Sequence, residues 1–325
     1  MPGSRVAIAS TVVDAASLPG FVSHHLATGF AHIFLFFDNP TDPAIAQWTG
    51  RDGVTVIPCD PALRQRQRSL DAFQRLGRYP DQLLTRQVLN AEMALQWAHE
   101  QGYHWLLHLD PDDLFFCPEL LACELFRLLA TRRIDEAVFL NDEAVPESLE
   151  VADPFQDVTL FKKNPALVMS LLPGIGSEQW PDGPDSYFCA NAQGRAACRT
   201  GPNRVVLGNS SFGSTTGPMA RVTVHTARIL HYANCGFTRF QHQHTAQGTH
   251  PGAWFEGSSL ALPFHRLARS HFASGDLAAA EALYRRRVMI EPATAVAPLL
   301  RAGLLRRIRL TDSHGVPAKS QTQES

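Results

Sequence analysis

The chain has 325 residues, of which 45% are hydrophobic and 18% are charged, and its 29 basic and 31 acidic residues give a formal net charge of -2. This length is enough to bury one large core or two ordinary ones, and the composition excludes disordered, collagen-like and coiled-coil proteins. The near-neutral balance also argues against a general nucleic-acid binder, so we expect no nucleic-acid partner.

The first part of the chain predicts strands that alternate with helices. Apolar runs of strand length occur at 5–13, 32–37, 54–57 and 105–109, and helical patterns occur at 18–30 and 85–100. Continuous apolar runs are typical of strands that are buried on both faces, as in a parallel sheet. The alternation therefore predicts an α/β fold with a mostly parallel open sheet.

The second part of the chain predicts shorter elements and longer loops. Short strands are expected at 137–140, 158–161, 222–224 and 228–232. From residue 262 to 310 the pattern is helical, and residues 271–292 resemble half of one tetratricopeptide repeat, which predicts a helical hairpin. We expect a main domain at 1–260, a small C-terminal helical extension at 261–312 and a flexible tail at 313–325.

The end of the helical segment is strongly basic. Residues 285–309 carry seven arginines and one glutamate, and Leu299, Leu300, Leu304 and Ile308 lie among four of these arginines. We expect a helix over 299–310, either as a solvated surface helix or as a peripheral contact with an anionic membrane. No secretory leader and no long apolar run is recognisable, so the sequence predicts a cytoplasmic protein without a transmembrane segment; the soluble part of a longer, anchored precursor is the alternative.

Three carboxylates follow the predicted strand at 105–109. Asp110, Asp112 and Asp113 come within four positions, at the strand end where open α/β sheets bind their ligands. Closely spaced carboxylates repel one another unless a cation neutralises them, and hard oxygen ligands suit Mg²⁺ or Mn²⁺. The alternative is an acidic turn in which Asp113 is the N-cap of a following helix. The apolar strand before the motif and the aromatic residues after it favour the metal site.

Several segments together resemble a known family. They are a first strand and helix ending in His25-x-x-x-Gly29, an apolar strand closing on Asp38-Asn39, and Asp110-x-Asp112-Asp113 after Trp105. This pattern resembles the family-2-like and family-92-like glycosyltransferases over about residues 5–120, and again at 192–199 and 229–232. Gly20-Phe21, Phe37-Asp38 and Asp113-Leu114 depart from the family's pattern, so the family's substrate is not carried over.

The resemblance implies the A-type glycosyltransferase fold, a nucleotide-sugar donor and a divalent cation, Mn²⁺ or Mg²⁺. It implies that Asp112 ligates the cation with help from Asp113, and that Asp110 belongs to the same set while approaching the ribose and sugar. His231 would be a distal ligand or a phosphate contact; a histidine packed at a strand end is the alternative.

The resemblance also implies a donor pocket. Thr11 and Val12 would line the nucleotide pocket, and Asp38 would accept from the base or the ribose. Arg86 lies one helical turn before Asn90, so both share a face that either touches the diphosphate or is solvated.

Two more arginines lie near the glycine-rich loop. Arg195 and Arg199 either pair with phosphate groups or belong to a surface turn.

An inverting transferase needs a carboxylate base that takes the proton of the acceptor hydroxyl. Glu143 is the first candidate and its neighbour Asp142 is close behind, while Glu178, Asp182 and Asp185 lie in a later loop. We retain Glu143, ranked first, and Asp185 as the predicted catalytic residues; for each of them an ordinary loop carboxylate is the favoured alternative.

Two other features are weaker. His242, His244 and His250 lack the spacing of a zinc motif, so we expect a loop over the active site instead. The six cysteines are scattered and are expected as reduced thiols.

The sequence thus predicts a metal-dependent, inverting glycosyltransferase that uses a carbohydrate or another hydroxyl acceptor. One alternative is a non-catalytic module that binds a nucleotide-sugar or a protein partner. Another is a phosphohydrolase of the haloacid dehalogenase type. That family places Thr or Val two positions after the second aspartate, where this chain has Leu114, and it needs a lysine downstream, for which only Lys162 and Lys163 are near.

Overall fold

The computed structural model describes residues 3–171, 187–208, 211–245 and 263–310. Its strands are β1 (Val6–Val12), β2 (His32–Phe37), β3 (Val54–Pro58), β4 (Trp105–His108), β5 (Asp113–Phe116), β6 (Glu136–Val145), β7 (Leu160–Lys162), β8 (Arg195–Arg199), β9 (Arg204–Gly208), β10 (Ser211–Ser214), β11 (Arg221–His231) and β12 (Leu305–Arg307). Within these residues, ten strands form one sheet with the path β12-β7-β6-β8-β4-β1-β2-β3, in which β11 pairs with both β5 and β6. Strands β9 and β10 form a separate hairpin.

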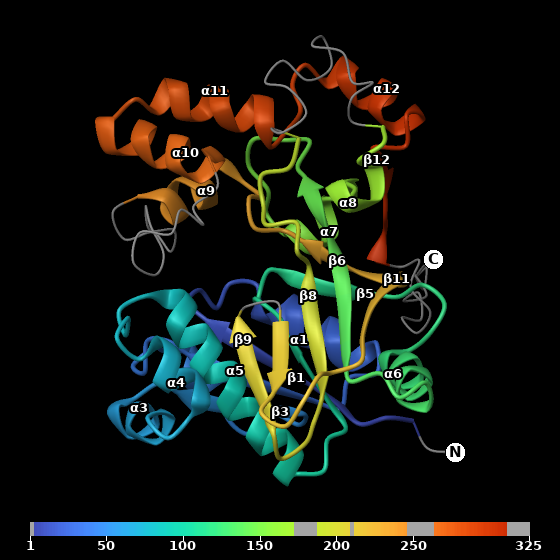
Figure 1. Cartoon of the computed structure of the whole chain (residues 1–325). Helices are drawn as coiled ribbons and strands as arrows, with labels where there is room; N and C mark the ends of the chain where they lie inside the picture. Colours follow the sequence, from blue (N-terminus) through green and yellow to red (C-terminus); the bar gives the residue numbers. More distant parts are fainter. Residues whose placement is uncertain (1–2, 172–186, 209–210, 246–262, 311–325) are drawn as a thin grey trace, which may run out of the picture.

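Helices cover both faces of this sheet (Figure 1). They are α1 (Leu18–Ala27), α2 (Ala44–Trp48), α3 (Pro61–Gln67), α4 (Asp71–Leu76), α5 (Leu83–Glu100), α6 (Ala122–Thr131), α7 (Pro154–Asp157), α8 (Pro165–Val168), α9 (Phe237–His244), α10 (Pro263–Ser274), α11 (Leu277–Arg287) and α12 (Val296–Arg301), with a 3₁₀ turn at Ala293–Ala295. None of the helices in the described part of the chain is long and apolar enough to cross a membrane.

The parallel half of the sheet follows directly from the apolar runs. Every residue of β1 is buried, and β1 pairs in parallel with β2 and β4, while β2 pairs in parallel with β3. Alternate β1 residues belong to different cores: Val6 and Ile8 pack with α1 and α6, whereas Ala7 and Ala9 pack with α5. The prediction of an α/β fold with a mostly parallel sheet is confirmed.

From residue 113 onward the structure settles several details. Asp113 begins strand β5, so the alternative in which it caps a helix is wrong, and β5 pairs antiparallel with β11. Residues 222–224 and 228–231, expected as two strands, belong to a single strand, β11, which has an irregularity between Val224 and Ile229. Residues 195–199 form β8, which runs antiparallel between β4 and β6.

The expected basic helix over 299–310 is wrong. Helix α12 ends at Arg301, Gly303 has the left-handed φ of +77°, and the chain then enters β12, the strand next to β7. Two of its arginines have partners inside the fold, since Arg306 lies 3.1 Å from Asp142 and Arg307 lies 2.7 Å from Glu147. The C-terminal segment therefore contributes a strand to the main sheet instead of a free amphipathic face.

The segment expected to form a helical hairpin contains part of α10 and all of α11, which pack against each other. The two helices pack on α9 at one end of the molecule, as Figure 1 shows. Tyr284 fixes this contact, because its buried hydroxyl donates to the carbonyl of Asn234 (2.8 Å) and accepts from the N–H of Gly236 (2.8 Å). All six cysteines are free thiols.

Candidate functional site

The candidate site begins where β4 ends at the carboxyl edge of the sheet. The chain turns tightly there: the N–H of Asp113 donates to the carbonyl of Asp110 (3.0 Å), and the N–H of Asp110 donates to Oδ2 of Asp113 (3.1 Å). The turn holds Asp110, Asp112 and Asp113 close together before the chain continues as β5.

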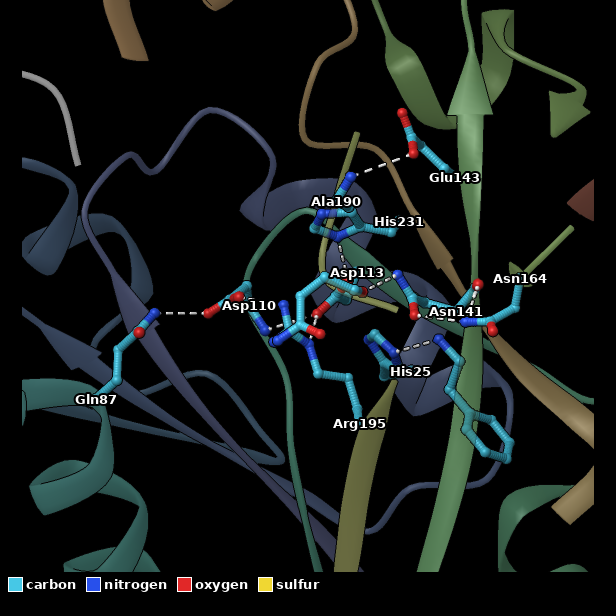
Figure 2. A network of polar contacts seen from close by, with 12 residues as sticks. His25, Gln87, Asp110, Asp113, Asn141, Glu143, Asn164, Ala190, Arg195 and His231 are labelled. Atoms are coloured by element: carbon cyan, nitrogen blue, oxygen red, sulfur yellow. Dashed lines mark hydrogen bonds and ion pairs between the residues drawn. The ribbon is translucent and has the colours of Figure 1, made fainter. Parts of the chain in front are cut away.

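Asp113 is the buried anchor of this turn (Figure 2). It is 0% exposed, and both of its oxygens are occupied. Arg195 Nε donates to Oδ2 over 2.6 Å, and His231 Nδ1 lies 2.7 Å from Oδ1. The β5–β11 register places His231 directly opposite Asp113. Burial alone would raise the pKa of the Asp113 carboxyl, but Arg195 and His231 outweigh it and hold that pKa well below its usual range.

Arg195 holds two of the three carboxylates. Besides Asp113 it pairs with Oδ2 of Asp110, whose other oxygen accepts from Gln87 Nε2 over 2.7 Å. Gly194 makes this approach possible, because it has φ +77° and a Cβ there would lie 2.2 Å from the carbonyl oxygen of Phe139. Burial raises the pKa of Asp110, and Arg195 offsets part of that shift.

Asp112 is different, because its carboxylate has no hydrogen bond or ion pair of its own within the described part of the chain. Its oxygens, those of Asp113 and the ring nitrogens of His231 include atoms that lie within 4.8 Å of one another. Carboxylate oxygens suit Mg²⁺ and Mn²⁺, and imidazole is an accepted ligand of transition metals, so this donor set fits a divalent cation.

The Asp113–His231 contact also determines which atoms are available. Because Nδ1 of His231 donates to Asp113, Nε2 is the nitrogen that a cation would bind in place of its proton; a carboxylate behind a metal-binding histidine is a common arrangement. Burial lowers the pKa of His231, but the Asp113 carboxylate overrides this and raises it to about 9.

His25 supports the same strand from behind. Its Nδ1 donates to the carbonyl of Phe21 (2.8 Å), and its Nε2 accepts from the N–H of Phe115 (3.1 Å). The histidine of the His-x-x-x-Gly motif is therefore a buried brace between α1 and β5, and Gly29 follows the helix with φ +95°.

A second polar group lies at the carboxyl ends of β1 and β2. Asp38 is bound bidentately by Arg86, with Nε and Nη2 each 2.7 Å from a carboxylate oxygen, and Arg64 adds a contact of 3.2 Å. Thr11 accepts from Asn90 Nδ2 (3.0 Å), and Asn90 in turn accepts from Gln67 Nε2 (2.8 Å).

We call this group, consisting of Thr11, Asp38, Arg64, Gln67, Arg86 and Asn90, the β1–β2 corner. Val12 is buried beside it. The structure thus brings together the four residues expected there, namely Thr11, Val12, Asp38 and Arg86. Asp38 forms an ion pair with Arg86, although the sequence analysis gave Asp38 a contact with the base or ribose and Arg86 a contact with the diphosphate.

Glu143 lies in a closed environment on β6. It is 2% exposed, and it accepts from the N–H groups of Cys189 (2.7 Å) and Ala190 (3.3 Å) and from Lys162 Nζ (3.3 Å). Its contact with Ala190 is seen in Figure 2. In this arrangement Glu143 fastens the segment around Cys189 to the sheet.

The neighbouring Asp142 is paired in a similar way on the other side of β6. It accepts from the N–H of Asn164 (3.2 Å) and lies 3.1 Å from Arg306 and 3.6 Å from Arg228. Burial raises its pKa to about 6, against the effect of Arg228.

The remaining expected site residues lie elsewhere. Arg199 is opposite Trp105, at the start of β4, so it lies at the far edge of the sheet, and only Arg195 reaches the carboxylates. Glu178, Asp182, Asp185 and His250 lie outside the described residues. His244 is buried against Phe240 and His265, away from any described group of three ligands, and His242 is exposed.

Sequence reasoning missed several members of these networks. Arg64, Gln67 and Gln87 carried no recognisable signal in the sequence, although Arg64 contacts Gln67 and Gln87 donates to Asp110. Lys162, one of the two lysines considered for the phosphohydrolase alternative, bonds to Glu143.

Comparison with known proteins adds the following. No protein-family model matches the chain. Two proteins of Arabidopsis thaliana named glycosyltransferase-like are similar to it, one 28% identical over 235 residues and the other 30% identical over 234 residues. Each alignment covers 70% of this chain but only 45% and 51% of the respective relative, so the chain spans about half the length of these proteins.

Solved structures give a weaker likeness. The mannosyltransferase Ktr4p of S. cerevisiae is 13% identical over 46% of this chain and 42% of its own, with a TM-score of 0.26. Core-mannan synthase A of Aspergillus fumigatus, solved in a Mn/GDP form, is 14% identical over 45% of this chain and 44% of its own, also with a TM-score of 0.26. At this TM-score the likeness supports no conclusion about the site.

Proposed function

We propose that the chain is a metal-dependent glycosyltransferase that moves a sugar from a nucleotide-sugar donor to a hydroxyl group of an acceptor. One observation carries the proposal: among the described residues Asp112 has no cationic partner, and it lies beside a histidine whose Nδ1 is already bound to Asp113. The two glycosyltransferase-like relatives support the same reading of the described fold.

Asp112 and Nε2 of His231 would hold the cation, and Asp113 would orient the histidine. A bound Mn²⁺ or Mg²⁺ would neutralise charge on the diphosphate leaving group. We assign Asp113 to the outer shell because its two oxygens already accept from Arg195, His231 and the N–H of Asp110. Asp110, whose oxygens bind Gln87 and Arg195, would act on the donor sugar or ribose and not on the cation.

The β1–β2 corner would receive the nucleotide. Its two arginines and one aspartate leave one positive charge in excess, which favours an anionic donor. Asp38 would accept from the base or ribose, and Arg86 and Arg64 would then be free to turn toward phosphate oxygens.

The transfer would be a displacement at the anomeric carbon. The acceptor oxygen forms the new bond, the bond to the diphosphate oxygen breaks, and its electron pair leaves with the nucleoside diphosphate. The acceptor proton goes to a carboxylate base, and inversion follows from a single displacement. Glu143 and Asp185 remain the predicted bases, but Glu143 would first have to give up a contact with Lys162 or with a backbone N–H.

The occupied oxygens of Glu143 also favour a second candidate function, which is binding of a nucleotide-sugar without transfer. The two functions differ in turnover and not in donor binding.

The deciding experiment measures donor hydrolysis and transfer for a panel of nucleotide-sugars with Mn²⁺, alongside the melting temperature, which rises when a ligand binds the folded state. We expect a Mn²⁺-dependent rise in melting temperature with one donor class, together with turnover that is lost in Asp112→Ala. Binding without any turnover favours the second function, and full turnover by Asp112→Ala contradicts the proposal.

A further inference from the structure

One edge of strand β6 changes its partner part of the way along the strand. Strand β11 pairs with β6 on both sides of this point, so it occupies one edge, and the other edge is shared by β8 at 136–139 and β7 at 143–145. Between these two ladders, residues 140–142 have no neighbouring strand on that edge within the described part of the chain. Buried backbone groups need hydrogen-bond partners, so side chains must supply them there.

Asn164, which follows β7, lies in this gap. It is fully buried, and its Nδ2 is 3.2 Å from the backbone carbonyl of Asn141, 3.2 Å from Oδ1 of the same residue and 2.9 Å from the carbonyl of Ala192. Its Oδ1 accepts from the N–H of Ala166 (2.9 Å), so the same side chain also caps α8. One amide group thus connects β6, the start of α8 and the segment that leads into β8.

That segment, residues 189–192, lies against β6 just before β8, and we call it the strap. Each strap residue has one backbone group that is held by a side chain. The contacts are Glu143 with the N–H groups of Cys189 and Ala190, Asn141 Nδ2 with the carbonyl of Asn191 (3.1 Å), and Asn164 Nδ2 with the carbonyl of Ala192. Figure 2 shows Asn141 and Glu143 on β6, with Asn164 beside Asn141. Side chains thus replace the backbone ladder between β8 and β7.

The strap leads directly to Arg195, and the chain between them is packed tightly against β6. Gly194 has φ +77°, and a Cβ there would lie 2.2 Å from the carbonyl oxygen of Phe139. Arg195 is opposite Phe139 in the β6–β8 register, and its guanidinium pairs with Asp110 and Asp113. A displaced strap would therefore displace this guanidinium from the two carboxylates.

We propose that Asn164 is a positioning residue: it holds the strap against β6 and, through the strap, holds Arg195 against the aspartate turn. The effect on Arg195 depends on no activity, and only its consequence for transfer rests on the proposed function. Glu143 holds the other end of the strap, but it is also a predicted base. Asn164 therefore gives the cleaner test of the strap.

The test uses Asn164→Ser. Serine keeps an oxygen that can cap α8, but its side chain is too short to reach the carbonyls of Asn141 and Ala192. Asn191→Ser is the matched control: Asn191 Oδ1 accepts from the N–H of Gln193 (2.9 Å), as a serine hydroxyl can, and its Nδ2 has no hydrogen-bond partner in the described part of the chain. Near-UV circular dichroism checks that both variants are folded.

Proton–nitrogen NMR of the Arg195 Nε–H reports its contact with Asp113 directly. This hydrogen bond is short (2.6 Å) and buried, so the wild type should show a downfield signal that exchanges slowly with water, and Arg195→Lys identifies the signal by its loss. In Asn164→Ser the signal should move upfield and exchange about tenfold faster or more, because the strap has lost a buried hydrogen bond. Asn191→Ser should keep the wild-type signal.

Kinetics give a second readout with any donor that the wild type turns over. Asn164→Ser should lower kcat by up to about a hundredfold, because a displacement of about 1 Å in a site has an effect of this size. The donor KM should stay within about twofold of the wild type, because the β1–β2 corner is unchanged. A residue that only stabilises the fold would alter neither the Arg195 signal nor kcat in the folded variant.

The inference is overturned if the Arg195 signal of Asn164→Ser matches that of the wild type, or if Asn191→Ser changes the signal equally. If Asn164→Ser does not fold, Asn141→Ser takes its place with the same expectations, because it removes the donor to the strap carbonyl of Asn191. A changed Arg195 signal in Asn164→Ser, in a protein that turns over no donor, would refute the glycosyltransferase function and leave the positioning role standing.

Discussion

The carboxylates along the sheet edge fall into two groups. Asp38, Asp110, Asp113, Asp142 and Glu143 each have a cationic partner in the chain itself, supplied by Arg86, Arg195, Arg306 or Lys162. Asp112 has none among the described residues, although it lies within the same turn as Asp110 and Asp113. Aspartates one or two positions apart in this turn therefore have different roles.

Spacing in the sequence alone therefore does not identify which carboxylate binds a cation. A buried carboxylate that already has its cation contributes to the structure, whereas one without a partner is available to a ligand. This account predicts that changes in the paired group alter mainly the free energy of unfolding, and that changes at Asp112 alter mainly activity.

The largest effect is expected for Asp112→Ala. Transfer should fall by about a thousandfold or more, because the loss of the cation removes several kcal/mol of stabilisation of the leaving group. The free energy of unfolding in urea should change by no more than about 0.5 kcal/mol, as for a surface change. Steady-state kinetics and urea denaturation of the same preparation measure both; strong destabilisation would place Asp112 with the paired carboxylates.

Arg195→Gln should give the opposite result. It leaves Asp110 without its cation and Asp113 with His231 alone, and the loss of one partner of a buried ion pair costs about 3–5 kcal/mol. Urea denaturation measures the loss. Arg221→Gln is the control, since Arg221 is 54% exposed and its pair with Glu136 is long (3.4 Å). Equal stabilities of the two variants would refute the role of Arg195.

The titration of Asp142 should make the free energy of unfolding depend on pH. Burial raises its pKa to about 6 in the folded protein, above the unfolded value near 3.8, so the folded state binds the proton more tightly. Its ionisation therefore costs stability at pH 7, and this cost disappears as the pH falls through 6 toward 4.

When the pH falls from 7 to 4, the free energy of unfolding of the wild type should rise by up to about 3 kcal/mol relative to that of Asp142→Asn. Urea denaturation of both proteins across this range measures the difference, and a pH-independent difference would show that Asp142 titrates normally.

Glu143→Gln should have the smallest effect. Cys189 and Lys162 donate to different oxygens of Glu143, so the single amide oxygen can accept from only one of them. The buried ammonium also loses its counter-charge, and the change costs about 1–3 kcal/mol. Glu147→Gln is the control, because the Glu147–Arg307 pair is about half exposed and should cost under about 1 kcal/mol. If Glu143→Gln instead keeps its stability and loses transfer, Glu143 is the base after all.

The sequence predicted well those features that depend on neighbouring residues. The apolar runs identified β1, β2 and β4, and the turn after β4 was visible as Asp110, Asp112 and Asp113 within four positions. The pairing of these carboxylates was not visible, because Arg195 lies 82 residues from Asp113 and His231 lies 118 residues away. Deciding whether Arg195 or Arg199 reaches the carboxylates required knowing the direction of β8. Predicting strand β12 required knowing that Asp142, the partner of Arg306, is buried in the neighbouring part of the sheet.

The central claim is that Asp112 and His231 hold the cation while Asp110 and Asp113 are held by the chain. Titration of Mn²⁺ followed by electron paramagnetic resonance, in which free and bound Mn²⁺ are distinguished directly, tests it without any substrate.

The account predicts that Asp112→Asn and His231→Asn abolish binding and that Asp113→Asn, as an outer-shell change, weakens it about 10–100-fold. Asp110→Asn should leave the affinity within about twofold of the wild type. Retained binding in Asp112→Asn, or an equal loss in Asp110→Asn, would contradict the account.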